Sequence, residues 1–228
     1  MHPMLLLPLL PFTCAAAVES ASVLFIGNSL TFTNDLPQML AGLASSGGLG
    51  EIAYASEVVG GASLKQHWLA GKAMNKLQSR RWTWVVIQEV SDGTVRHPDD
   101  FATYGRLFID AVKANGSRPV LYQTWAKLGE MDTQVRITAA YHALGVATGA
   151  QIVPAGLAFA GYRATHGDGS LFTDNRHPTP AGTYLAACCF YQALFGKDPL
   201  GLPGEAARLD DSSARDLQRI ASSVALPR

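Results

Sequence analysis

One serine near the beginning of the chain and an aspartate–histidine pair near its end have the residue types of a nucleophilic site. Ser29 follows the apolar run 23–26 and lies in the turn 27–30, which reads Gly-Asn-Ser-Leu. Asp174 stands three residues before His177, and a proline follows the histidine. A serine hydroxyl is a weak nucleophile at neutral pH, and it reacts when an imidazole takes its proton and a carboxylate holds that imidazole. These residues therefore predict a triad of serine, histidine and aspartate.

The elements that must bring these residues together alternate between strand and helix. We expect strands at 22–26, 52–59, 83–88, 119–123 and 152–153, and helices from about 35 to 46 and at 63–78, 98–113, 131–147 and 179–195. Strands separated by helices predict a parallel sheet that is covered on both faces. The tail, residues 205–228, is charged and rich in alanine, and it forms either a helix packed on the domain or a frayed end.

The ligand site of an open parallel sheet lies beyond the carboxyl ends of its strands. Ser29 follows the first expected strand, Gly61 follows the second, and Gln88 ends the third. His177 lies in the segment before the last core helix, which can return to the same rim. We therefore expect these residues to meet although up to 148 positions of sequence separate them.

The composition describes one compact domain. The chain has 228 residues, of which 48% are hydrophobic and 16% are charged. This length and balance suit a single α/β domain with a large core. Lys and Arg together number 18, as do Asp and Glu, so the formal net charge is zero. Nothing in this charge favours a nucleic acid or an anionic membrane surface as a partner.

The first residues are typical of a targeting segment. Residues 4–17 are apolar and end in three alanines, which resemble a small-residue cleavage site. The run is short for a bilayer span, so we expect no stable membrane insertion. We predict a signal peptide at 1–17, a mature domain at 18–228, and export to the periplasm or the medium. The alternative is a core strand or helix at the start of the domain.

Together, the two blocks that hold Ser29 and His177 resemble those of the SGNH (GDSL-type) hydrolase superfamily of esterases and lipases. In that family a Gly-Asp-Ser-Leu-type block follows the first strand, and an Asp-x-x-His block precedes the last core helix. Here the turn 27–30 has asparagine in place of that aspartate, whereas 174–177 fits without change. The resemblance spans about residues 22–195. It implies a three-layer α/β/α sandwich with a central, mostly parallel five-stranded sheet of the flavodoxin-like kind.

The resemblance also implies the donors of an oxyanion hole. The backbone N–H of Ser29 is one, and the family's second block adds a glycine N–H, for which Gly61 is our candidate. The third block normally supplies an asparagine amide, but no asparagine stands there in this chain. Gln88 is the nearest primary amide at the strand end, so we expect it to donate instead. Its replacement by alanine should then keep the fold and lower kcat by about 10²–10³.

Four further residues are candidates for substrate contact, each with a structural alternative. Asn28 either touches substrate or shapes its turn through side-chain to backbone hydrogen bonds. His67 either lines the pocket or is a satisfied core histidine, and Trp125 is either a platform for a sugar ring or part of the core. Glu89 lines the site or binds solvent, and a glycoside-cleaving acid pair with Asp92 is a further alternative.

The resemblance implies a serine esterase that hydrolyses small acyl esters, and acetyl groups on carbohydrates are the first expectation. Export brings the protein near polysaccharides, and the sequence has no long apolar segment of the sort that covers a lipase site. The chemistry requires no metal and no organic cofactor. The alternatives are a short-chain lipid esterase or thioesterase, and a carbohydrate-binding module without turnover. The missing asparagine of the third block favours that module, whereas the complete triad opposes it.

Overall fold

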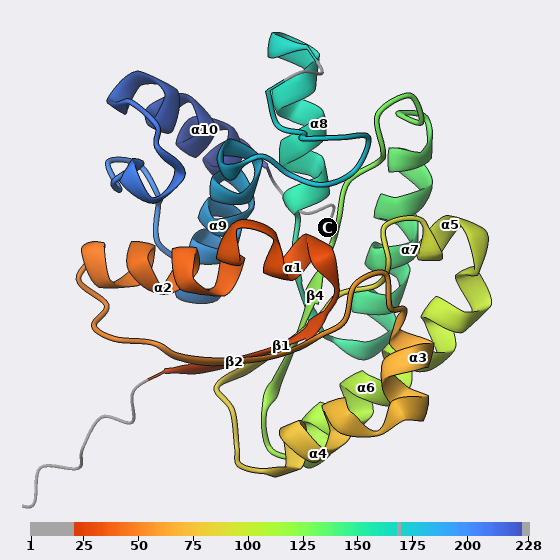
Figure 1. Ribbon diagram of the computed structural model, residues 1–228. Helices are drawn as coiled ribbons and strands as arrows, with labels where there is room; N and C mark the ends of the chain where they lie inside the picture. Colours follow the sequence, from red (N-terminus) through yellow and green to blue (C-terminus); the bar gives the residue numbers. More distant parts are fainter. Residues whose placement is uncertain (1–20, 168–169, 225–228) are drawn as a thin grey trace, which may run out of the picture.

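A five-stranded parallel sheet forms the centre of the molecule (Figure 1). The computed structural model describes residues 21–167 and 170–224, so the predicted signal peptide at 1–17 lies outside the described residues. The strands are β1 (Ser22–Gly27), β2 (Ala53–Val58), β3 (Trp84–Ile87), β4 (Arg118–Tyr122) and β5 (Gln151–Val153). They lie in the order β2-β1-β3-β4-β5, and each neighbouring pair is parallel. The predicted parallel, flavodoxin-like sheet is confirmed.

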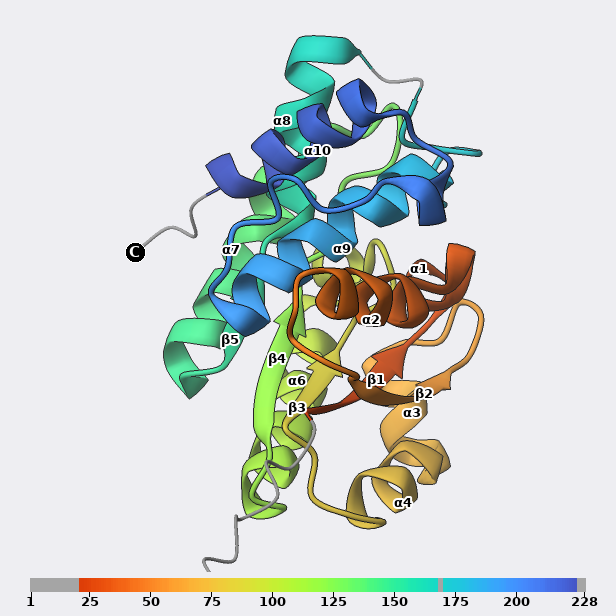
Figure 2. The ribbon, with the colours of Figure 1, turned by 90° about the vertical axis from the view of Figure 1, so that its left-hand side faces the viewer.

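Helices cover both faces of this sheet, which makes three layers (Figures 1 and 2). One face carries α2 (Leu36–Ser46), α8 (Ala155–His166), α9 (Pro180–Phe195) and α10 (Asp211–Ser223). The other carries α3 (Leu64–Ala70), α4 (Lys72–Gln78), α6 (Pro98–Ala114) and α7 (Thr133–Thr148). Side chains of a strand alternate between faces, so Phe25 packs into the first core and Ile26 into the second.

The tail is a helix packed on the domain, which decides between the two predicted alternatives. In α10, Leu217 and Ala221 are buried in the core beside α9. The amide of Gln218 is also buried and donates to the hydroxyl of Tyr184 at 2.6 Å and to the carbonyl of Leu202 at 2.7 Å. Apolar packing and satisfied polar groups together hold this helix in place.

The expected helix over 63–78 is wrong in one respect, because it breaks into α3 and α4 at Gly71. This residue has φ +73°, a left-handed conformation that glycine adopts without a steric penalty, and its N–H donates to the carbonyl of Trp68. Three helices were not predicted: α1 (Ser29–Phe32), α5 (Gly93–Arg96) and α8. The first two are single turns, and α8 is rich in alanine and glycine with no clear apolar period. None of the helices within residues 21–167 and 170–224 is long and apolar enough to cross a bilayer.

Candidate active site

A cleft of about 300 Å³ lies beyond the carboxyl ends of β1, β2 and β3. It is lined by Asn28, Ser29, Leu30, Gly60, Gly61, Val90, Ser91, Arg176 and His177. These residues come from four separate parts of the chain: the turn after β1, the loop after β2, the segment after β3, and a loop before α9. We call the loop at residues 173–178 the histidine loop and the segment at residues 88–93 the third-strand turn.

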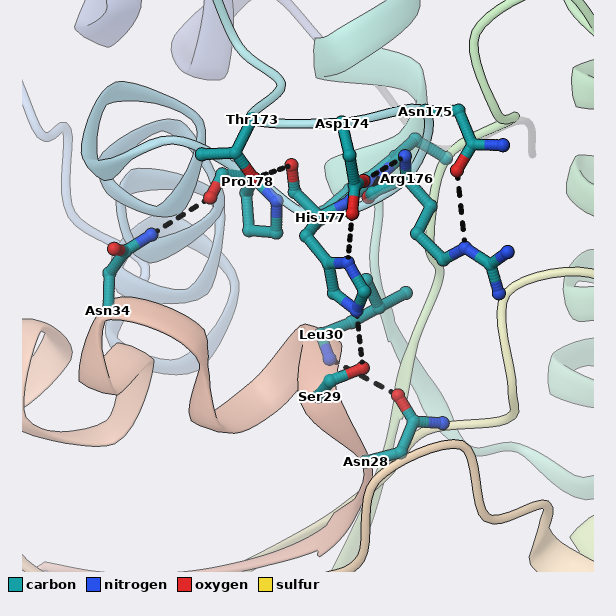
Figure 3. Close-up of polar contacts among 11 residues, drawn as sticks. Asn28, Ser29, Leu30, Asn34, Thr173, Asp174, Asn175, Arg176, His177 and Pro178 are labelled. Carbon is teal, nitrogen blue, oxygen red and sulfur yellow. Dashed lines mark hydrogen bonds and ion pairs between the residues drawn. The ribbon is translucent and has the colours of Figure 1, made fainter.

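Ser29, His177 and Asp174 form one hydrogen-bonded line (Figure 3). Nε2 of His177 lies 2.9 Å from Oγ of Ser29, and Nδ1 lies 2.7 Å from Oδ2 of Asp174. A carboxylate only accepts hydrogen bonds, so Nδ1 carries the ring proton and donates it to Asp174. Nε2 is then the acceptor for the serine hydroxyl. The structure therefore brings together the three residues of the predicted triad, in the order that general-base activation of a serine requires.

Asp174 is held as a carboxylate by several donors although its side chain is 51% exposed. The hydrogen bond from the His177 ring lowers the pKa of Asp174 most, and the backbone N–H groups of His177 and Arg176 lower it further. Both of these N–H groups reach Oδ1 at 2.7 Å, so Oδ2 is left to face the imidazole. The short spacing of three residues thus makes a closed turn in which the carboxylate is oriented before any substrate arrives.

The histidine loop is fastened to the rest of the domain at three points. Nδ2 of Asn34 donates to the carbonyl of Pro178 at 3.0 Å, which ties the loop to the segment that follows α1 (Figure 3). Nε1 of Trp125 donates to the carbonyl of Arg176 at 2.9 Å, and the N–H of Leu128 donates to the carbonyl of Asn175 at 2.9 Å. These bonds fix the distance between Ser29 and His177 across the rim.

The turn at residues 27–30, which we call the serine turn, is built around a glutamine that follows the neighbouring strand β3. Oε1 of Gln88 accepts from the N–H of Asn28 and from the hydroxyl of Thr31, both at 2.9 Å. Gly27 permits this approach, because a Cβ there would lie only 2.5 Å from Oε1 of Gln88. Oδ1 of Asn28 accepts from the N–H of Leu30 at 3.2 Å and caps α1, the single turn that begins with Ser29.

The N–H groups of Ser29 and Gly61, the two predicted backbone donors, make no hydrogen bond to another described residue, and the same holds for those of Gly60 and Ser91. Nδ2 of Asn28 donates to the carbonyl of Ala62 at 3.0 Å, which links the loop of Gly61 to the serine turn. The N–H of Ala62 in turn donates to the carbonyl of Val59 at 3.1 Å. The side chain of Asn28 thus shapes the turn, as one of its two predicted roles required. Its bonds hold the N–H groups of Ser29 and Gly61 beside the same cleft.

The expectation that Gln88 donates to an oxyanion is wrong. Its side chain is fully buried, Oε1 is used by the serine turn, and its amide nitrogen donates to the carbonyl of Glu89. The amide therefore lies inside the fold, and it is not among the residues that line the cleft. The missing asparagine of the third block is therefore not replaced by this amide, and Gln88 supports the turn that presents Ser29.

Three of the residues proposed for substrate contact belong to the structure around the cleft. The indole of Trp125 is buried and stacks on Phe159 at 3.8 Å between ring centroids, so it offers no face to a sugar. His67 is buried beside an adjoining hollow and donates from Nε2 to the carbonyl of Gly27 at 2.7 Å. Glu89 is buried as well and does not line the cleft.

Glu89 fastens the third-strand turn to α3. Its Oε1 accepts from the N–H of Val90 at 2.7 Å, and its Oε2 accepts from the N–H of Leu64, the first residue of α3, at 3.3 Å. Burial raises the pKa of Glu89 to about 7, and the two backbone donors only partly oppose this. Asp92 is committed elsewhere, since its Oδ2 pairs with Lys127 and Arg96. The two carboxyls therefore do not form an acid pair facing the cleft.

Two polar side chains of the cleft were not predicted, those of Ser91 and Arg176. Ser91 follows the third strand by four residues, and its hydroxyl makes no hydrogen bond to another described residue. Arg176 directly precedes His177 and extends its guanidinium along the same side of the loop (Figure 3). Both residues adjoin a predicted block, which could have indicated that they lie near the cleft. The direction of a side chain in a loop cannot be predicted from the sequence.

A larger hollow of about 630 Å³ lies at the amino ends of the strands, where Arg80, Arg81 and Arg118 line it. Its lining contains neither a histidine nor a carboxylate, so no base stands beside a nucleophile there. The larger volume of this hollow therefore does not make it the candidate active site. Among residues 21–167 and 170–224, no group of three or more His, Cys, Asp or Glu is arranged to hold a metal ion.

Comparison with solved structures finds the same fold in several bacterial proteins. A protein from Slackia heliotrinireducens that is assigned to the SGNH hydrolases is 30% identical over 77% of this chain and 99% of its own length, with a TM-score of 0.67. A DUF4886 family protein from Bacteroides uniformis is 20% identical, covers 89% of this chain and 93% of its own, and has a TM-score of 0.78. An acetylxylan esterase from Geobacillus stearothermophilus is 16% identical over 81% and 95%, with a TM-score of 0.64.

The last two similarities show a common fold and no more, because their identities are low. No family model matches the chain, and no curated protein sequence matches it. The first similarity differs, because it joins 30% identity to coverage of nearly the whole of the Slackia protein.

Proposed function

The chain belongs to the SGNH hydrolase superfamily, and from this premise we propose that it is a serine esterase for small acyl esters, with acetyl groups on carbohydrates as the natural substrates. The observation that carries the proposal is the line of hydrogen bonds from Ser29 through His177 to Asp174. Such a line is what a serine needs to attack a carbonyl carbon at neutral pH.

The reaction follows the order of these bonds. Oγ of Ser29 attacks the ester carbonyl while Nε2 of His177 takes the hydroxyl proton. The same nitrogen then gives the proton to the leaving alcohol, and an acyl group remains on the serine. Water repeats the sequence, with His177 as base again, and releases the carboxylic acid. Asp174 holds the ring tautomer and stabilises the imidazolium that forms in each half.

The negative oxygen that develops on the carbonyl requires donors on the opposite side from the histidine. The N–H groups of Ser29 and Gly61 are unpartnered at the cleft and suit this role. A third donor is the hydroxyl of Ser91. Among the described residues, the only amide side chain that lines the cleft is that of Asn28, and it donates to the carbonyl of Ala62. In this proposal Ser91 stands where the family's asparagine amide would act.

The size and edge of the cleft support a small acyl group on a sugar. A volume of about 300 Å³ is at the lower end for ligand pockets. The ring of Phe32 is 47% exposed and lies beside Gly60, where an added Cβ would be 4.0 Å from its Cζ. An exposed aromatic ring at the rim can stack on a sugar, which is the role that buried Trp125 cannot fill. Export, which the apolar residues 4–17 predict, would bring the enzyme to extracellular polysaccharides.

The test compares the wild-type protein with Ser29→Ala on p-nitrophenyl esters of increasing chain length. We expect hydrolysis of the acetate ester with a kcat that falls by at least about 10⁴ in the variant. Thermal melting of both proteins controls for folding. Equal background rates for the two proteins would refute the esterase proposal and favour a binding module. A maximum at eight carbons or beyond would refute the acetyl preference and favour a lipid esterase.

A further inference from the structure

Arg176 places a positive charge beside the triad, and its backbone is fixed at both ends. Its N–H donates to Oδ1 of Asp174 at 2.7 Å, and its carbonyl accepts from Nε1 of Trp125 at 2.9 Å. The starting point of the side chain is therefore set by the same bonds that set His177. Figure 3 shows the side chain running alongside the imidazole, away from the Asp174 carboxylate.

The guanidinium has no acidic partner among residues 21–167 and 170–224. Its Nε donates a hydrogen bond to Oδ1 of Asn175 at 3.3 Å, which leaves the two terminal nitrogens available. Two other cations near the third-strand turn differ, because Lys127 and Arg96 both pair with Oδ2 of Asp92 at 2.7 Å. Asp92 thus neutralises the charges of Lys127 and Arg96, whereas no described carboxylate pairs with Arg176.

The cleft itself contains no negative side chain. Apart from the triad histidine, its lining consists of small, apolar and neutral polar residues together with Arg176. Arg176 is a partly buried residue, and a ligand that supplies an anion would form a charge-assisted pair with its guanidinium. The fork of two terminal N–H groups matches the two oxygens of a carboxylate, which a bidentate pair binds with defined geometry.

We propose that Arg176 binds a carboxylate of the substrate close to the scissile ester, so that the preferred substrates are acetylated uronic acid units rather than acetylated neutral sugars. This inference rests on the proposed esterase function and names its substrate class. It assigns to Arg176 the role of a specificity residue. The chemistry at the ester carbonyl remains with Ser29 and His177.

Matched substrates that differ only in charge test the proposal. Mono-O-acetylated methyl glucuronosides carry the carboxylate, and the corresponding glucuronamides are neutral. We expect wild-type kcat/KM to be about tenfold higher or more for the glucuronosides, with a ratio that falls as salt is added. Arg176→Gln should reduce this ratio at least about tenfold, and Arg176→Lys should keep part of it. A wild-type ratio of one or less, or an unchanged ratio in Arg176→Gln, would overturn the proposal.

A second charge deletion and a binding assay keep the two proposals distinguishable. Arg106→Gln removes an exposed arginine of α6 on the far face, and it should leave the ratio unchanged. Binding is measured by NMR titration of Ser29→Ala with methyl glucuronoside and its glucuronamide, so that no turnover is required. Tighter binding of the glucuronoside, lost on adding Arg176→Gln, would support the carboxylate site even if the wild-type protein hydrolysed no ester. Equal binding would refute it whatever the esterase assays show.

Discussion

The histidine loop and the third-strand turn lie at the same rim of the sheet, and both carry an acidic residue next to polar neighbours, yet they use these groups in opposite ways. In the histidine loop, Asp174 is half exposed, and its donors lower its pKa. In the third-strand turn, Glu89 is buried, and burial raises its pKa to about 7. The carboxylate of Asp174 orients the imidazole of His177, whereas the carboxyl of Glu89 holds the third-strand turn against α3.

A polar residue at a strand end is available to a substrate when the fold does not use its side chain. The side chains of Gln88 and Glu89 satisfy backbone groups of the serine turn and of α3, so their hydrogen-bonding capacity is used within the fold. In the histidine loop the backbone supplies the bonds instead, through Arg176 and His177 to Asp174. This leaves the side chains of Arg176 and His177 free to face the cleft.

The largest effect that separates the two regions is expected from Asp174→Asn. Asparagine can keep the bonds from the two backbone N–H groups, but it presents an NH₂ group to Nδ1 of His177. The ring must then change tautomer, and Nε2 can no longer accept the serine proton. We expect kcat to fall by about 10³–10⁴ with little change in melting temperature. Steady-state kinetics on p-nitrophenyl acetate measures this, with exposed Asp110→Asn as control; a loss below tenfold would show that Asp174 does not orient the base.

Glu89→Gln is expected to act on stability and its pH dependence. A carboxyl whose pKa rises from 4.5 to about 7 on folding binds its proton more tightly in the folded state. Its contribution is fully present below about pH 4.5 and is lost as pH rises through 7. The wild-type free energy of unfolding should therefore fall by about 2–3 kcal/mol between pH 5 and pH 8, relative to the variant.

Urea denaturation at the two pH values measures this difference. The opposite contribution of Asp174, whose pKa is lowered, is lost only as pH falls below about 4 and does not enter this window. Glu51→Gln, at an exposed position before β2, is the control and should leave the pH dependence unchanged. Parallel stability curves for wild type and Glu89→Gln would mean that Glu89 is ionised throughout, and the contrast between the two carboxyls would fail.

The smallest effects distinguish Gln88 from Ser91 within one turn. Gln88→Ala leaves the N–H of Asn28 and the hydroxyl of Thr31 without their buried acceptor, so the free energy of unfolding should fall by about 1–3 kcal/mol. Ser91→Ala removes no hydrogen bond between described residues, so its stability should be unchanged, while the loss of an oxyanion donor lowers kcat about tenfold or more. Paired denaturation and kinetics would contradict this assignment if the two variants exchanged their effects.

Much of the fold was predictable because it depends on periodic patterns. The apolar runs of β1 and β3, separated by helices, specify a parallel sheet, and the carboxyl ends of such strands meet at one rim. Local turns were predictable as well where a proline or capping residue marks them. Asp35 caps α2, Pro37 lies in its first turn and Gly47 ends it, which agrees with the helix expected from about 35 to 46. The break at Gly71 was missed because the apolar face continues across it.

Some features of the site depend only on residues close together in the sequence, and these were predictable. The spacing of Asp174 and His177 is enough to form their bond, since both residues lie in one closed turn. The position of Ser29 directly after a strand is also readable from sequence. These features determined where a nucleophile, a base and an orienting carboxylate could come from.

Which polar neighbours reach the cleft depends on packing between distant parts of the chain. Gln88 and Ser91 are three residues apart in the third-strand turn. Gln88 is buried against the serine turn, whereas Ser91 lines the cleft. Trp125 looks like a sugar platform in sequence but is enclosed by the aromatic core. The physical reason is that a side chain's direction and burial depend on what packs against it from distant parts of the chain, and sequence spacing carries no record of those neighbours.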